Sequence, residues 1–200
     1  MLKNKLNITN QAELNREEER ISKLCARELF DSGHLDNIEV GTFQGLSEIH
    51  KIILGDIYDF AGQVRDVNIS KGNFRFAPVM YLAQSLDYIS KMPHNTFDEI
   101  IEKYVEMNIA HPFREGNGRA GRIWLDIMLK SALGKVVDWN GVDKQKYMDA
   151  MVRSAVNNTE IKALLSSALT DRANDREIFM RGIDASYYYE GYNEYITEKL

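Results

Sequence analysis

The stretch His111-Pro-Phe-Arg-Glu-Gly-Asn-Gly-Arg-Ala-Gly-Arg122 holds one imidazole, one carboxylate, three glycines and three guanidinium groups. Gly116, Asn117 and Gly118 tolerate positive φ, so the backbone can turn sharply at this point. Residues 119–130 then carry apolar side chains at helical spacing. The stretch therefore predicts a glycine-rich turn that leads directly into a helix.

A turn of this kind presents the backbone N–H groups of the first helical turn, which makes an anion site, and phosphate is the usual anion. Arg119 and Arg122 are three residues apart, so we expect both to share one helix face and to bind phosphate oxygens. Glu115 would be repelled by a polyphosphate unless a cation lay between them, and one carboxylate plus phosphates is a common Mg²⁺ site. His111 is the group of this stretch that takes up a proton near pH 7.

The same residues match the Fic family signature, His-x-Phe-x-(Asp/Glu)-Gly-Asn-Gly-Arg-x-x-Arg, at every specified position. The stretch thus resembles a Fic catalytic motif. This resemblance implies an all-α helical bundle with a short β-hairpin flap over the active site. It also implies an enzyme that transfers AMP from ATP to a Tyr, Thr or Ser hydroxyl of a target protein.

The resemblance also assigns roles to individual residues. It implies that His111 is the catalytic base and that Glu115 binds Mg²⁺, with another divalent metal as the alternative. We expect the nucleotide to contact Lys71, Asn108, Gly116, Asn117, Gly118, Arg119, Ala120, Gly121, Arg122 and Lys144.

The composition fits one soluble domain over residues 1–200. Apolar residues make up 44% and charged residues 28% of the chain, and the net charge of −5 argues against nucleic-acid binding. The single cysteine, Cys25, can form no disulfide within the chain, which suits a reducing cytosol, so we expect a cytoplasmic protein. No apolar run approaches the roughly 18 residues that span a bilayer, and no signal-peptide pattern is present, so we expect no membrane association.

Helix signals recur along the chain. Asn10, Thr96 and Asp143 are expected helix caps, because each precedes an amphipathic segment. Glu17, Glu18, Glu19 and Arg20 are expected to form a solvated helix face. Helices are predicted over residues 10–33, 40–60 with an interruption at 55, 78–92, 96–110, 119–130, 143–153, 158–169 and 171–183.

Residues 63–76 differ from the rest of the chain, because their strand-like alternation flanks Lys71-Gly72-Asn73 and predicts a β-hairpin. A two-stranded ribbon alone is barely stable in water. Its edge can instead pair with an extended segment of a partner protein. We expect a target-docking flap formed by Ser70, Lys71, Gly72, Asn73 and Phe74; the alternative is a purely structural hairpin.

Ser186 and Glu190 lie four residues apart near the end of the chain, and Gly191 follows them. This pattern resembles the inhibitory (Ser/Thr)-x-x-x-Glu-(Gly/Asn) motif of single-domain Fic proteins. The resemblance implies an autoinhibitory helix over residues 186–198, with Glu190 paired to Arg122 so that ATP cannot lie in line for attack. The alternative is a last amphipathic helix that packs on the core.

Other functions are compatible with the same residues. Glu190 could orient a water molecule that removes AMP from a modified protein, which would give a hydrolase or a bifunctional enzyme. A non-catalytic module that captures peptides on the hairpin is the alternative from another class. Five of the ten tyrosines lie in the tail, so self-modification there is a further hypothesis. A homo-oligomer is also possible, because the sequence does not separate exposed apolar helix faces from core faces.

Overall fold

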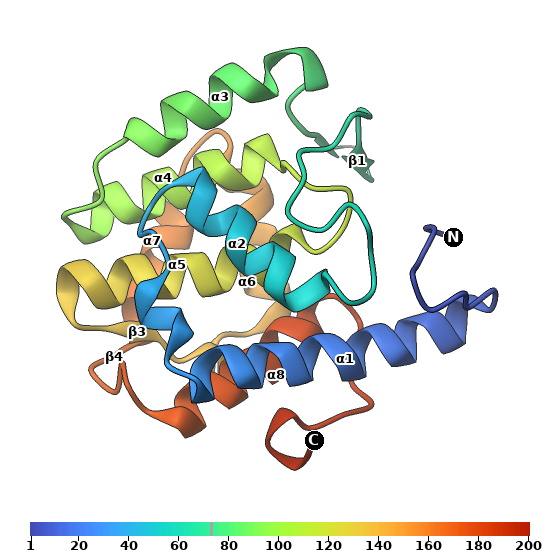
Figure 1. The fold of residues 1–200 in the computed structure, drawn as a ribbon. Helices are drawn as coiled ribbons and strands as arrows, with labels where there is room; N and C mark the ends of the chain where they lie inside the picture. The colour runs from blue at the N-terminus through green and yellow to red at the C-terminus, as the bar shows by residue number, and fades with distance from the viewer. Residues whose placement is uncertain (73) are drawn as a thin grey trace.

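The structure is a computed structural model that describes residues 1–72 and 74–200. Over these residues the chain forms eight α-helices (Figure 1). They are α1 (Gln11–Asp31), α2 (Phe43–Leu54), α3 (Val79–Lys91), α4 (Phe97–Ala110), α5 (Asn117–Leu133), α6 (Lys144–Ser154), α7 (Thr159–Ser167) and α8 (Arg176–Tyr189). The predicted all-α fold is confirmed.

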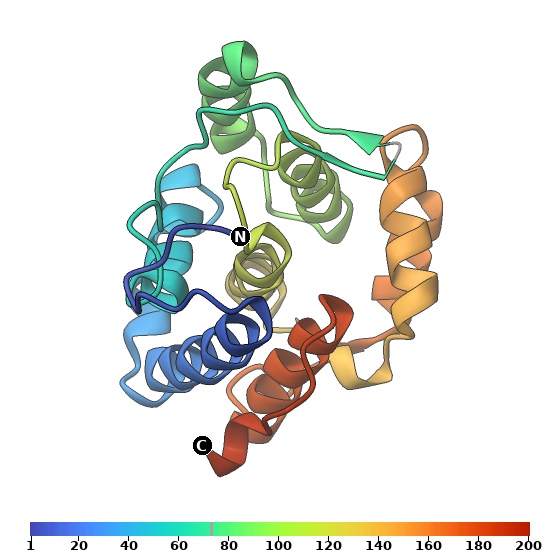
Figure 2. The same cartoon turned by 90° about the vertical axis from the view of Figure 1, so that its right-hand side faces the viewer.

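Helix α5 lies in the middle of the bundle, as Figure 2 shows, and α2, α4 and α8 pack against it. Helix α1 lies alongside both α2 and α8 (Figure 1). The motif thus starts the helix that all the others surround. None of the helices in the described ranges is both long enough and apolar enough for a membrane span.

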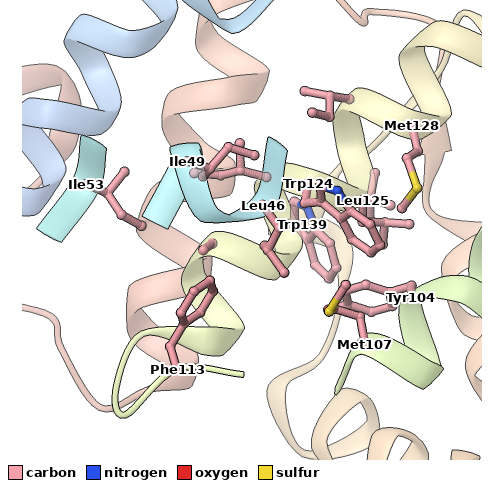
Figure 3. Close-up of a cluster of buried hydrophobic side chains, with 14 of the residues drawn as sticks. Leu46, Ile49, Ile53, Tyr104, Met107, Phe113, Trp124, Leu125, Met128 and Trp139 are labelled. Carbon is pink, nitrogen blue, oxygen red and sulfur yellow. The ribbon is translucent and has the colours of Figure 1, made fainter. Parts of the chain in front are cut away.

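The core is built around the side chains that α5 sends into the bundle. Trp124 and Met128 of α5 are fully buried and belong to the same core cluster as Ile49 of α2 and Tyr104 of α4 (Figure 3). Burial of each large apolar side chain of this kind contributes about 1.5–3 kcal/mol. The indole N–H of Trp124 also donates to the carbonyl oxygen of Thr42, the residue that caps α2.

The predicted helix caps are present. The side-chain oxygens of Asn10 and Asp143 accept the backbone N–H groups of Glu13 and Lys146. Thr96 and Glu99 form a complete capping box, in which each side chain binds the backbone of the other residue. Caps of this type stabilise a helix by roughly 1 kcal/mol each, and they fix the start of α4, the helix that leads to His111.

The predicted hairpin is present but short. Strand β1 (Ser70–Lys71) pairs antiparallel with β2 (Phe74–Arg75), and Gly72 at the tip has φ 58°. Asn73, which we placed in the same flap, lies outside the described residues. A second ladder, which the sequence did not predict, joins β3 (Val136–Val137) to β4 (Leu169–Thr170).

The C-terminal helix differs from its prediction. The side chain of Asp175 accepts two backbone N–H groups and starts α8 at Arg176, and the helix ends at Tyr189. Gly191 has φ 96°, a conformation that ends helices. A helix over residues 186–198 is therefore wrong: Ser186 and Glu190 lie at the end of a longer helix, and only a short 3₁₀ turn (Thr197–Lys199) follows.

Candidate active site

A groove of about 560 Å³ lies between the hairpin, the end of α4, the start of α5 and one face of α6. It brings together most of the predicted site residues, although they come from distant parts of the chain. Its lining consists of Ile69, Ser70, Lys71, Phe74, Phe76, Asn108, His111, Arg114, Glu115, Gly116, Asn117, Gly118, Arg122, Tyr147, Met148, Met151, Val152, Glu190 and Tyr192.

His111 is the C-cap of α4 and lies in the left-handed region, with φ 49° and ψ 63°. Its Nδ1 is 3.2 Å from the carbonyl oxygen of Asn108, so the proton belongs on Nδ1 and Nε2 keeps a free lone pair. Burial lowers the pKa of His111 to about 4. The imidazole is therefore neutral at pH 7 and can accept a proton through Nε2.

The glycine-rich turn is closed by an amide. Asn117 accepts the N–H of Phe113 (2.8 Å) and donates to its carbonyl oxygen (2.7 Å). Gly116 takes φ 75° at the start of α5, and the ring of Phe113 is fully buried. The side chain of Asn117 thus shapes the turn, while the first N–H groups of α5 lack partners within the helix and face its N-terminal end.

Glu115 faces the groove with a side chain that is 41% exposed. Its Oε1 accepts Arg119 Nη2 and the N–H of Gly116, both at 3.0 Å. Among the described residues, no group of three His, Cys, Asp or Glu could hold a metal ion. A single carboxylate beside a helix N-terminus fits Mg²⁺ when a bound polyphosphate supplies further oxygen ligands.

Arg122 is tied to the end of α8. Its Nε donates to Ser186 Oγ at 2.6 Å, and its Nη2 lies 2.9 Å from Glu190 Oε1. On the other side of the groove, Lys71 Nζ is 3.7 Å from Glu190 Oε2. A Cβ atom at Gly118 would collide with the Glu190 carboxylate, so this carboxylate lies over the N-terminus of α5.

Arg119 does not reach the groove. Its side chain is 1% exposed, and its Nη1 pairs with Glu18 Oε1 at 2.6 Å, behind the turn. Glu18 also accepts the hydroxyl protons of Tyr58 and Tyr192. The prediction of a solvated face is therefore wrong for Glu18 and equally for Glu19, because both carboxylates are buried among polar partners.

Three more predicted nucleotide contacts lie outside the groove lining. Ala120 is fully buried, and Gly121 lies inside the bundle with its Cα facing Tyr104. Lys144 Nζ donates to the carbonyl oxygen of Tyr188 at 2.9 Å and lies over that ring. Its predicted contact with the nucleotide is therefore not supported by the geometry.

Sequence reasoning missed two side chains that act on the site, and it assigned only packing to a third. Phe76 stacks on the imidazole of His111, with ring centroids 3.7 Å apart. His50 is buried and bonds the carbonyl oxygen of Glu115 through Nε2 at 2.8 Å. Arg65 donates to the carbonyl oxygen of His111 at 2.8 Å. No local pattern marks these residues, since their partners lie 35 to 65 positions away in the sequence.

Several curated proteins are similar to this chain. VbhT, a protein adenylyltransferase of Bartonella schoenbuchensis, is 30% identical over 187 residues, which cover 88% of this chain and 38% of that protein. The probable protein adenylyltransferase y4lH of Sinorhizobium fredii is 30% identical over 77% of this chain and 83% of its own length. The probable protein adenylyltransferase Fic of Salmonella typhimurium is 31% identical over 63% of this chain and 68% of its own.

Solved structures have the same fold. BepC of Bartonella tribocorum with bound AMPPNP superposes with a TM-score of 0.68 at 20% identity, over 85% of this chain and 92% of that one. The N-terminal Fic domain of Bep8 from Bartonella sp. 1-1C gives a TM-score of 0.71 at 18% identity, over 86% and 92%. The Fic/DOC family profile matches residues 42–129, from the cap of α2 to the last turns of α5. The chain belongs to the Fic/DOC family.

Proposed function

We propose that the chain is a protein adenylyltransferase that transfers AMP from ATP to a hydroxyl group of a target protein. The observation that carries this proposal is the groove, in which a neutral imidazole, a helix N-terminus and a hairpin edge meet. Residues 1–200 act as one Fic domain in this scheme, since α1 and the C-terminal tail both pack on the central bundle. The names of VbhT and y4lH support the same reaction.

The nucleotide lies in the groove with its phosphates at the N-terminus of α5 and its base at α6. Its phosphates lie over Gly116–Gly118, where the N–H groups and the positive end of the α5 dipole favour an anion. Its base lies against Tyr147, Met148 and Met151 of α6, which offer a mainly apolar wall. The AMPPNP bound to BepC and the ADP bound to a Fic domain from Bartonella quintana support a nucleotide in this fold.

The reaction is an in-line displacement at the α-phosphorus. A target segment pairs with the exposed edge of β1–β2 and brings its hydroxyl next to His111. Nε2 takes the hydroxyl proton as the oxygen attacks, and the bond to the leaving pyrophosphate breaks with its electron pair. When bound at Glu115, Mg²⁺ supplies positive charge to the phosphate oxygens. Backbone N–H groups at the start of α5 hold the negative charge that develops.

Glu190 inhibits the transfer reaction in this scheme. Its carboxylate occupies the place over Gly118 where phosphates are expected, and it holds the guanidinium of Arg122. Arg122 is then unavailable for the γ-phosphate, and a displacement of the nucleotide by about 1 Å costs roughly 10²-fold in rate. Burial alone would raise the pKa of Glu190, but the charges of Arg122 and Lys71 outweigh it and bring it to about 2. The pair is therefore fully charged at pH 7.

The test is transfer of label from ATP labelled on the α-phosphate to protein in a cell lysate. We expect His111→Ala to abolish labelling while the unfolding temperature stays unchanged, and Glu190→Gly to increase it about 10²-fold. Glu194→Gly, in the same tail but outside the groove, is the matched control and should label like the wild type. If Glu190→Gly labelled no more protein than this control, the inhibitory role would be wrong.

Removal of AMP is a second candidate, because Glu190 presents Oε2 to the groove that also holds His111. This carboxylate could orient a water molecule for attack on an AMP-modified protein. A pre-modified target, incubated with the protein and Mg²⁺ but without ATP, would lose AMP only in that case. Failure of the protein to bind ATP would instead favour a peptide-binding module.

A further inference from the structure

Arg65 lies between α2 and the hairpin, and its side chain is 2% exposed. Its guanidinium group donates four hydrogen bonds, all to backbone carbonyl oxygens. Among the ion pairs of the described residues, none involves Arg65. A buried cation without a carboxylate is costly unless every donor finds a partner, so these carbonyl groups explain why Arg65 is tolerated.

The four carbonyl oxygens belong to two segments that border the groove, the hairpin and the end of α4. Nη1 binds Val67, just before β1, at 2.7 Å, and Nη2 binds Ala77, just after β2, at 2.5 Å. Nη2 also binds Ala110 at 3.2 Å, and Nε binds His111 at 2.8 Å. One planar group therefore joins both ends of the hairpin to the end of α4.

The backbone around His111 depends on this support. A residue other than glycine in the left-handed region costs about 1–3 kcal/mol and persists only where its surroundings fix it. The backbone N–H of Arg65 donates to the carbonyl oxygen of Pro112 at 2.8 Å, so the same residue holds both His111 and Pro112. The ring that stacks on the imidazole, Phe76, precedes Ala77 directly. Arg65 thus acts on the backbone of His111 and on the residue next to its stacking partner.

The positive charge of Arg65 also affects His111, in addition to the hydrogen bonds that hold its backbone. Burial is the main cause that lowers the pKa of His111, and the positive charges of Lys71 and Arg65 lower it further, against the opposing charge of Glu190. Burial lowers the pKa of Arg65 as well, but a guanidinium group stays protonated in proteins. Lysine could supply the charge, but it lacks the planar fork that reaches carbonyl groups on three sides.

We propose that Arg65 is a positioning residue that fixes the hairpin and the His111 imidazole as one unit, so that a hydroxyl docked on the hairpin lies within reach of Nε2. The role in catalysis rests on the proposed AMP transfer. The mechanical role does not, because the hydrogen bonds join the hairpin to His111 whatever the reaction.

The experiment compares Arg65→Gln and Arg65→Lys with the wild type by three measurements. NMR of labelled histidine gives the pKa of His111, hydrogen exchange gives the protection of hairpin and α4 amides, and labelled ATP gives AMP transfer. We expect Arg65→Gln to raise the pKa of His111, while burial keeps it below its ordinary value. We also expect it to lower the protection of both segments together and to reduce transfer about 10²-fold.

Arg65→Lys separates charge from geometry. It should leave the pKa of His111 near that of the wild type and still lower transfer and joint protection, since the fork is lost. ATP affinity should stay unchanged in both variants, because the turn at Gly116–Gly118 is intact. If Arg65→Gln does not fold, Arg65→Lys carries the test through exchange and transfer.

Lys103 offers a matched control. It is a fully buried cation of α4 that donates to the carbonyl oxygens of Ser90 and Met92, away from the groove. Lys103→Gln should lower the unfolding temperature without moving the pKa of His111 or the transfer rate. If Arg65→Gln behaved in the same way, Arg65 would have only a structural role. If the wild type transferred no AMP at all, the pKa and exchange measurements would still decide the mechanical role.

Discussion

The two motif arginines leave α5 one turn apart and end in different surroundings. Arg119 points behind the turn, where Glu18 is 2% exposed and holds it through a buried ion pair. Arg122 points along α8, where its partner Glu190 is 20% exposed and faces the groove. Both arginines belong to the same sequence motif, but the Glu190 carboxylate faces the groove and the Glu18 carboxylate is buried.

Their aromatic neighbours extend this difference. The guanidinium of Arg119 lies over the rings of Tyr187 and Tyr192, at 5.3 and 5.1 Å from their centroids. Arg122 lies 5.8 Å from Tyr147 and 5.4 Å from Tyr189. Both sites thus hold a cation against tyrosine rings, which contributes about 0.5–2 kcal/mol per contact. The two sites differ in the carboxylate that comes from another helix, since Glu18 is 2% exposed and Glu190 is 20% exposed; Arg119 also pairs with Glu115 of the turn, which is 41% exposed.

Removal of the buried carboxylate is expected to have the largest effect. Glu18→Ala leaves Arg119 charged and buried without its main partner, and such losses cost about 3–5 kcal/mol. Unfolding in urea measures this change. Glu17→Ala, one residue earlier on α1 with an exposed Arg20 partner, is the control and should change stability by less than about 1 kcal/mol. Equal losses of stability in the two variants would mean that the buried Glu18–Arg119 pair contributes no more to stability than an exposed ion pair.

Removal of the groove-facing arginine is expected to affect rate rather than stability. In the Glu190→Gly background, Arg122→Ala removes the proposed ligand of the γ-phosphate and should lower AMP transfer about 10²-fold. Arg153→Ala in the same background is the control, because Arg153 pairs with Glu160 on the surface. An unchanged rate for Arg122→Ala would show that Arg122 serves only to hold α8.

Acid should loosen the groove-facing pair. The pKa of Glu190 is lowered from 4.5 to about 2, so its pair stabilises the fold above about pH 4.5 and this contribution is lost as the pH falls to about 2. We expect the free energy of unfolding to fall less steeply between pH 5 and 2 in Glu190→Gln than in the wild type. Parallel curves for the two proteins would contradict the pairing.

The smallest effect is expected for a variant of the Glu18–Arg119 site, which lies behind the glycine-rich turn. Tyr192→Phe removes one hydrogen bond to Glu18 Oε1 (2.8 Å) but keeps the ring against Arg119. We expect a loss of about 0.5–1.5 kcal/mol in urea unfolding. Tyr188→Phe, with an exposed ring outside the groove, should cost nothing measurable. A loss above about 3 kcal/mol for Tyr192→Phe would mean that this hydroxyl has a larger role than one hydrogen bond.

Local signals in the sequence predicted the fold well. Asn10, Thr96 and Asp143 cap helices because a side-chain oxygen next to an amphipathic segment is enough to start one. The hairpin followed from a glycine between two alternating runs, and the motif turn from Gly116–Gly118. These predictions succeed because each depends on neighbours within four or five residues.

The predictions that failed depend on distant partners. Glu18 lies one turn after Leu14, on the buried face of α1. A buried carboxylate needs a cation as its partner, and here that cation is Arg119, 101 residues further along the chain. The sequence around Glu18 therefore did not reveal its burial. Arg119 and Arg122 are three residues apart, a spacing that predicts a shared helix face. Their side chains still leave the helix in directions about 60° apart around its axis, which is enough to bring them into different surroundings. Arg65 gives no local signal at all, since its partners are backbone carbonyl groups.

The small ladder between β3 and β4 joins the chain just after α5 to the chain just before α8. The N–H of Val137 in this ladder also donates to Asp126 of α5, which anchors it to the central helix. Helix α8 has 14 residues, so its two ends lie about 20 Å apart. The hydroxyl group of Tyr189, at the end of α8, donates to the carbonyl oxygens of Trp139 and Val142, so the end of the helix that carries Glu190 is attached to the same part of the chain as β3.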